Sequence, residues 1–92
     1  MKSIHARIRG RVQGVGYRAW TIETATRLGL TGWVRNRLDG SVEAVFQGSD
    51  IALYKMLEKC EDGPLLARVL EIKTKDLVDE REYEDFTSKS TR

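Results

Sequence analysis

Residues 3–18 of this chain read SIHARIRGRVQGVGYR, and the first two elements of the architecture follow from them. Apolar and polar residues alternate from Ser3 to Val12, which is typical of a strand with one buried and one wet face. The glycine-rich segment 13–16 cannot continue that strand. The spacing then predicts a helix over residues 17–28. Its apolar residues recur at every third position: Ala19, Ile22, Ala25 and Leu28.

The rest of the chain completes the order β-α-β-β-α-β. The predicted elements are strands over 32–37 and 41–48 around an Asp39-Gly40 turn, a helix from Ser49 or Asp50 that Gly63-Pro64 ends, a strand over 67–75 and a weakly alternating strand over 83–88. This order predicts an α+β fold, the ferredoxin-like sandwich, with two helices on one face of a mostly antiparallel sheet of four to five strands. Because a helix joins the first two strands, they run parallel, and the return strand of the hairpin fits between them. Segment 13–18 and Asn36 are therefore expected at the same edge of the sheet.

Composition limits the function classes further. The chain has 92 residues, of which 40% are hydrophobic and 33% charged, as expected of one globular domain. No apolar run approaches the roughly 20 residues of a membrane span, and the N-terminus has no apolar signal core. One cysteine and one histidine exclude an internal disulfide and a cage of Cys or His ligands. We expect a single cytoplasmic domain over residues 1–92, without a metal or another cofactor.

Charge is distributed unevenly along the chain. Residues 1–37 carry eight basic residues and one acid, whereas residues 38–92 carry eight basic residues and thirteen acids. A basic half with so few acids indicates an anionic partner, such as a phosphate or a nucleic acid. The alternative is that these arginines are simply solvated.

The glycine-rich segment is a candidate anion site. A glycine-bearing turn between a strand and a helix can point successive backbone N–H groups at an anion. Arg18, in the first turn, opposes the helix dipole by ~0.3–1 kcal/mol, which makes sense if it shares a bound phosphate with those amides. The alternative is a tight turn with a solvated arginine. Asn36 is a second candidate, because asparagine is disfavoured in strands, although it also suits the end of a strand before a turn.

Two familiar phosphate motifs do not account for this segment. No Gly-Lys-Ser/Thr triplet follows, so it is not a P-loop. The spacing Gly14-x-Gly16-x-x-Ala19, with Asp39 about 20 residues further on, matches the relaxed dinucleotide fingerprint. However, the chain lacks the strands of a doubly wound sheet, and the next strand turns back as a hairpin.

Two longer motifs connect the chain to a known family. The first is Ile8-x-Gly10-x-Val12-Gln13-Gly14-Val15-x-Tyr17-Arg18, and the second is Gly32-Trp33-Val34-Arg35-Asn36, continuing with Gly40-x-Val42 and Gly48. Similarity extends through Gly63-Pro64, Ala67-Arg68-Val69 and Asp85-Phe86. With both motifs at the correct spacing, the chain resembles the acylphosphatases, small enzymes that hydrolyse acyl phosphates to a carboxylate and inorganic phosphate. It departs from them at Tyr17, where the family usually has Phe or Met, and this tyrosine is expected to add a hydroxyl beside the loop. It also departs in a polar tail after Phe86, where the family usually keeps an apolar strand.

The resemblance implies a site and a reaction. It places the catalytic arginine at Arg18, the catalytic asparagine at Asn36 and the phosphate-binding loop at Gln13, Gly14, Val15, Gly16 and Tyr17. Because the leaving carboxylate has a pKa of ~4–5, the reaction needs no strong general acid. Arg18 and the loop amides would neutralise the phosphoryl oxygens, and Asn36 would hold the attacking water. We expect the substrate's own phosphate oxygen to take the proton, without a covalent intermediate.

The expected partners follow from this reaction. They are a small acyl phosphate and inorganic phosphate, the latter as product and competitive inhibitor, with the chain acting as a monomer away from membranes. Acetyl phosphate, carbamoyl phosphate and 1,3-bisphosphoglycerate remain open as substrates.

Two alternative functions remain. One is a ferredoxin-like module that binds RNA or other anions through the open sheet face, which carries Arg7, Arg9, Arg11, Arg35 and Arg37. Against it, the central strands lack the paired aromatics on which RRM-type sheets stack bases. The other is the acylphosphatase-like part of a larger carbamoyl-transferring protein, which a chain of 92 residues disfavours.

Overall fold

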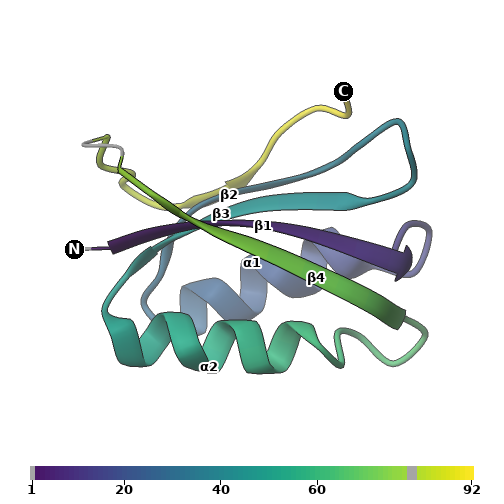
Figure 1. The fold of residues 1–92 in the computed structure, drawn as a ribbon, viewed down its shortest axis with the longest axis horizontal. Helices are drawn as coiled ribbons and strands as arrows, with labels where there is room; N and C mark the ends of the chain where they lie inside the picture. The colour runs from purple at the N-terminus through teal and green to yellow at the C-terminus, as the bar shows by residue number, and fades with distance from the viewer. Residues whose placement is uncertain (1, 79–80) are drawn as a thin grey trace.

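A five-stranded sheet with both helices on one face forms the molecule (Figure 1). The computed structural model describes residues 2–78 and 81–92. Its elements are β1 (Lys2–Arg11), α1 (Tyr17–Arg27), β2 (Thr31–Asn36), β3 (Val42–Gly48), α2 (Asp50–Cys60), β4 (Arg68–Leu77) and β5 (Phe86–Ser88). The strand order is β4-β1-β3-β2-β5, and every pairing is antiparallel except that of β2 with β5. The ferredoxin-like fold predicted from the sequence is confirmed, including the position of β3 between the parallel strands β1 and β2.

The core lies between the sheet and the two helices. On β1 the alternating residues Ile4, Ala6 and Ile8 are buried, as the pattern predicts. They pack with Phe46 of β3, Leu53 and Met56 of α2, and other apolar residues in one cluster. In the part of the chain that the structure describes, no helix is long and apolar enough to cross a membrane.

The buried face of α1 matches the predicted one only in part. Ala19 is exposed and Ile22 and Leu28 are half-buried, whereas Tyr17, Thr21, Thr24 and Ala25 face the core. Burial of threonine is tolerated where its hydroxyl has a partner within the helix, as for Thr21, whose Oγ1 donates to the carbonyl oxygen of Tyr17 at 2.7 Å. Ala25 is thus the one member of the predicted stripe that is fully buried, and Ile22 and Leu28 pack against the core cluster. Ala19 and Ile22 line the pocket described below.

The C-terminal segment is a shorter strand than alternation suggested. β5 covers only Phe86–Ser88, and Phe86 is buried with its ring stacked on that of Phe46, 5.5 Å between centroids. The polar tail then stays beside β2: the Lys89 N–H donates to the Val34 carbonyl at 2.9 Å. The Arg92 N–H donates to the Asn36 carbonyl at 3.3 Å. The tail therefore supports the end of β2 through backbone hydrogen bonds.

Substitution of Gly32 tests the close packing of β2 against β3. The φ of Gly32 is +135°, and a Cβ atom there would collide with the carbonyl oxygen of Val45 on β3. We expect Gly32→Ala to lower the free energy of unfolding by at least about 3 kcal/mol, because the strain and the clash fall on backbone atoms that cannot move aside. Gly29→Ala is the control. Its φ is +78° with no atom within 4 Å of the added Cβ, so it should cost only about 1 to 2 kcal/mol. Equal losses in urea titrations of the two variants would contradict this account.

Candidate active site

The two motifs meet in one pocket of about 390 Å³ at the carboxyl edge of β1 and β2. Gln13, Gly14 and Gly16 line it from the loop, Arg18 from the start of α1 and Asn36 from the end of β2. The prediction that the loop and Asn36 lie close together is thus confirmed. The remaining lining residues are Val12, Tyr17, Ala19, Ile22 and Ser88. Val15 is not among them; it packs against the core cluster instead.

The loop leaves the start of α1 open to an anion. Gly14 and Gly16 have φ of +73° and +81°, a conformation that favours glycine, and open space surrounds both. Gly16 is the N-cap of α1 and supplies no side-chain acceptor, and the first turn holds no acidic residue. The first N–H groups of the helix therefore have neither a capping side chain nor a carboxylate beside them. Such a helix start favours a bound anion.

Arg18 is exposed at the rim of this pocket. It makes no hydrogen bond or ion pair with any residue that the structure describes, unlike Arg27 on the same helix, which pairs with Glu23 at 2.7 Å. Its guanidinium is therefore available to a ligand, with donors in the fork geometry that matches phosphate oxygens. Asn36 is half-buried, and its backbone carbonyl is held by the tail.

Tyr17 does not place a hydroxyl in the pocket. Its side chain is buried, and the hydroxyl donates to the carbonyl oxygen of Cys60 at 2.6 Å, at the end of α2. Burial, followed by the contact with Cys60, raises the pKa of Tyr17 well above its usual range. The expectation that the family's Phe or Met is replaced here by a hydroxyl beside the loop is wrong, because the ring turns into the core.

The sequence missed Ser88 as a lining residue. It lies on β5 opposite Val34, and this pairing brings it to the pocket. The weakly alternating residues 83–88 do not show how this strand pairs with β2, so the sequence could not place Ser88 at the pocket.

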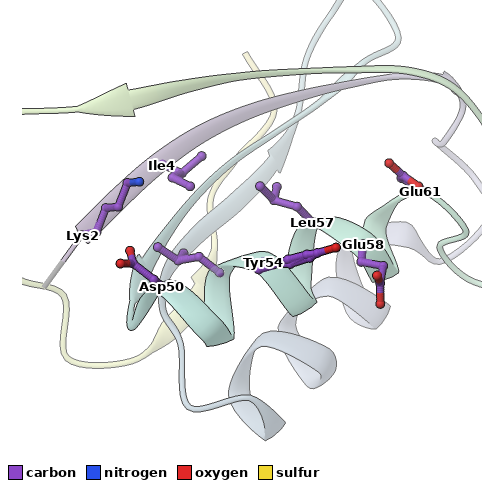
Figure 2. A pocket seen from close by; sticks show the side chains of 8 residues that line it. Lys2, Ile4, Asp50, Tyr54, Leu57, Glu58 and Glu61 are labelled. Carbon is purple, nitrogen blue, oxygen red and sulfur yellow. The ribbon is translucent and has the colours of Figure 1, made fainter.

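A second hollow of about 510 Å³ lies elsewhere, between the start of β1 and α2. Figure 2 shows Ile4 and Leu57 in this hollow, with Lys2 and Asp50 together at one end. Three carboxylates and one ammonium line it: Asp50, Glu58, Glu61 and Lys2. It is larger than the loop pocket, but its acidic lining disfavours a phosphate. No residue of either sequence motif lines it.

The open face of the sheet is not the free basic strip that the charge asymmetry suggested. Glu43 accepts a hydrogen bond from His5 at 2.7 Å and pairs with Arg35 at 3.1 Å and Arg37 at 3.4 Å. Burial tends to raise the pKa of this carboxyl, but the hydrogen bond and the cations outweigh it, so the pKa lies below its usual value.

Asp39 neutralises two further arginines of the open face, Arg7 and Arg9. It pairs with Arg7 at 3.3 Å and with Arg9 at 3.4 Å, and hydrogen bonds from Ser41 first, then these cations, lower its pKa. Two acids of residues 38–92, Asp39 and Glu43, thus lie among the arginines of residues 1–37 and neutralise four of them. Among the described residues no group of three or more His, Cys, Asp or Glu is arranged to hold a metal ion.

Comparisons with known proteins agree with this geometry. The acylphosphatase family model matches residues 4–88. The curated acylphosphatase of Rhodospirillum rubrum is 59% identical over 69 residues, which cover 75% of this chain and 76% of that protein. That of Nitrobacter winogradskyi is 60% identical over 65 residues, which cover 71% of this chain and 66% of that protein.

Solved structures show the same fold. The acylphosphatase from Bacillus subtilis superposes with a TM-score of 0.93 at 32% identity, covering 96% of this chain and 98% of that one. Full-length HypF in its phosphate- and nucleotide-bound form superposes with a TM-score of 0.89 at 25% identity, covering 98% of this chain and 12% of HypF. The fold therefore occurs both by itself and within a much longer protein.

Proposed function

Because this chain belongs to the acylphosphatase family of hydrolases, we propose that it cleaves the carboxyl–phosphate bond of acyl phosphates through attack of water on phosphorus. The observation that carries the proposal is the loop pocket. There Arg18, which pairs with no described residue, lies with the open start of α1 and Asn36 around one space. Phosphoryl transfer depends mainly on positioning and on neutralising the oxygens of the transferred group, and these residues supply both.

Arg18 and the loop amides bind the phosphoryl oxygens in this proposal. The guanidinium donates two parallel hydrogen bonds, and the backbone N–H groups of segment 13–17 donate others. Asn36, across the pocket, holds the attacking water. The water and the leaving group then lie on opposite sides of phosphorus.

Proton transfer comes from the substrate. The side chains that line the pocket include no carboxylate and no imidazole, so a protein base is lacking within the described residues. A phosphate oxygen takes the proton of the attacking water, and the carboxylate leaves without a general acid. Ser88 is a hydroxyl without a base to activate it, and therefore we expect no covalent phosphoenzyme.

Further features of the enzyme belong to the same proposal. The pocket is built from one chain, which supports activity as a monomer, with residues 1–92 acting as a single domain. Inorganic phosphate occupies the loop as product and competes with the substrate. The buried, unpaired Cys60 thiol fits a reducing compartment, and we place the protein in the cytoplasm.

Hydrolysis of benzoyl phosphate tests the proposal. We expect phosphate release that excess chelator does not reduce and that inorganic phosphate inhibits competitively. No release above the spontaneous rate would refute the hydrolase assignment, and activity lost to chelator and restored by magnesium or zinc would refute the mechanism.

A gel-shift titration tests the competing class in parallel. Because Asp39 and Glu43 neutralise most arginines of the open sheet face, we expect no tight binding of single-stranded RNA. Tight, salt-sensitive RNA binding without turnover would favour the RNA-binding module instead.

A further inference from the structure

The side chain of Gln13 connects the phosphate loop to the strand that carries Asn36. Its Nε2 donates to the carbonyl oxygen of Arg37 at 2.8 Å and to that of Ser41 at 2.8 Å. Arg37 directly follows Asn36, so one amide group spans from the beginning of the loop to the residue beside the catalytic asparagine. We infer that Gln13 is a positioning residue, which sets the distance between the bound phosphoryl group and the water held by Asn36.

These two hydrogen bonds leave the side chain no donor for the substrate. A glutamine amide has two N–H hydrogens, and the carbonyls of Arg37 and Ser41 accept both. Its remaining polar atom, Oε1, is an acceptor and repels phosphate oxygens. Gln13 therefore serves the phosphate at most through its backbone N–H, and its side chain has the separate task of fixing the loop.

The anchor for Gln13 is itself held firmly. Ser41 is buried, and its carbonyl oxygen also accepts the N–H of Arg37 at 2.8 Å. Its hydroxyl donates to Asp39 Oδ1 at 2.6 Å and accepts from Arg7 Nε at 2.7 Å. The Ser41 N–H donates to the same carboxylate oxygen at 3.0 Å. Several hydrogen bonds thus hold the turn of the hairpin, and Gln13 attaches the phosphate-binding loop to this fixed point.

The chemistry makes this distance important. Water must approach phosphorus in line with the leaving group, and a misplacement of about 1 Å can cost about 100-fold in rate. Binding of phosphate is less demanding, because the guanidinium of Arg18 and the loop amides move together with the loop. Loss of the Gln13 link should therefore affect kcat much more than the affinity for phosphate.

The test compares Gln13→Met with Gln47→Met. Methionine keeps the length of glutamine but donates nothing. Gln47 is a matched control, since its buried Nε2 also donates two hydrogen bonds, to Ser3 Oγ at 2.9 Å and to the Arg81 carbonyl at 2.7 Å, and it does not line the loop pocket. For benzoyl phosphate we expect Gln13→Met to lower kcat by about 10- to 100-fold, with the inhibition constant of inorganic phosphate changed by less than about threefold. Gln47→Met should lower the melting temperature without lowering kcat.

Since this inference rests on the proposed function, a second measurement does not use turnover. Asn36 is the single asparagine of the sequence, so selective ¹⁵N-asparagine labelling gives one side-chain amide signal. Saturation with inorganic phosphate should shift this signal in the parent and in Gln47→Met. In Gln13→Met phosphate should still bind, but the shift should shrink by half or more.

Three outcomes separate the possibilities. A folded Gln13→Met with parental kcat and a parental Asn36 shift overturns the inference. Loss of phosphate affinity in proportion to kcat also overturns it, because Gln13 would then be a phosphate ligand. A parent that does not hydrolyse acyl phosphates refutes the proposed function, whereas the Asn36 shift still decides whether Gln13 positions this residue.

Discussion

Arg18→Ala is expected to lower kcat/KM for benzoyl phosphate by about 1000-fold or more and to remove inhibition by inorganic phosphate. Among residues 2–78 and 81–92, Arg18 is the only one with a charged side chain that lines the loop pocket, and none of these residues pairs with it. In the proposed mechanism this one charge binds the phosphate in the ground state and stabilises the transition state, so the variant should lose both effects. Initial rates and phosphate inhibition constants, measured on the same preparations, give both effects.

Arg27→Ala is the matched control for this experiment. Arg27 lies on the same helix, but it faces solvent and pairs with Glu23, so its loss should leave activity unchanged. Arg18→Lys should recover little, because an ammonium cannot reproduce the two parallel hydrogen bonds of the guanidinium. If Arg18→Ala stays within a few-fold of the parent, Arg18 is not the phosphate ligand.

The second large effect is expected at Asn36. Asn36→Ala should lower kcat by about 100- to 1000-fold, while inorganic phosphate still binds within a few-fold of the parental affinity. This separation follows if Asn36 holds the attacking water rather than the phosphate, because an interaction used chiefly in the transition state affects kcat alone.

A purely structural role of Asn36 predicts a different pattern. The end of β2 would loosen, the melting temperature would fall, and activity would follow the folded fraction. Leu38→Ala is a suitable control, since Leu38 is exposed in the adjoining turn and should change neither quantity.

Asn36→Asp keeps the shape but places a negative charge beside the phosphate. It should weaken phosphate binding at neutral pH and recover as acidification protonates the carboxyl. An Asn36→Ala protein that is folded and turns over normally would remove Asn36 from the site.

Local pattern predicted much of the fold and the location of the site. Alternation along β1 placed Ile4, Ala6 and Ile8 in the core, and the rule for parallel strands joined by a helix placed β3 between β1 and β2. From that topology alone, the loop and Asn36 were expected at one edge of the sheet. These inferences succeed because they depend on periodicity and chain order, which the sequence contains directly.

The features that sequence reasoning missed depend on contacts between distant residues. Tyr17 turns into the core because the Cys60 carbonyl, 43 positions away, accepts its hydroxyl. Gln13 binds carbonyls 24 and 28 positions away. The arginines of the open face are neutralised by Asp39 and Glu43, which belong to the acidic half of the sequence. Composition along the chain cannot show such pairings, since they arise only when the hairpin folds back against β1.

Hydrolysis of benzoyl phosphate in H₂¹⁸O tests the central claim most directly, because it reports which atom the water attacks. In the proposed reaction, water held beside Asn36 attacks the phosphorus bound by Arg18 and the loop. Mass spectrometry of the products should then find one ¹⁸O atom in the inorganic phosphate and none in the benzoate, after the spontaneous reaction is subtracted. Label in the benzoate would mean that water attacks the acyl carbon, and this result would contradict the account.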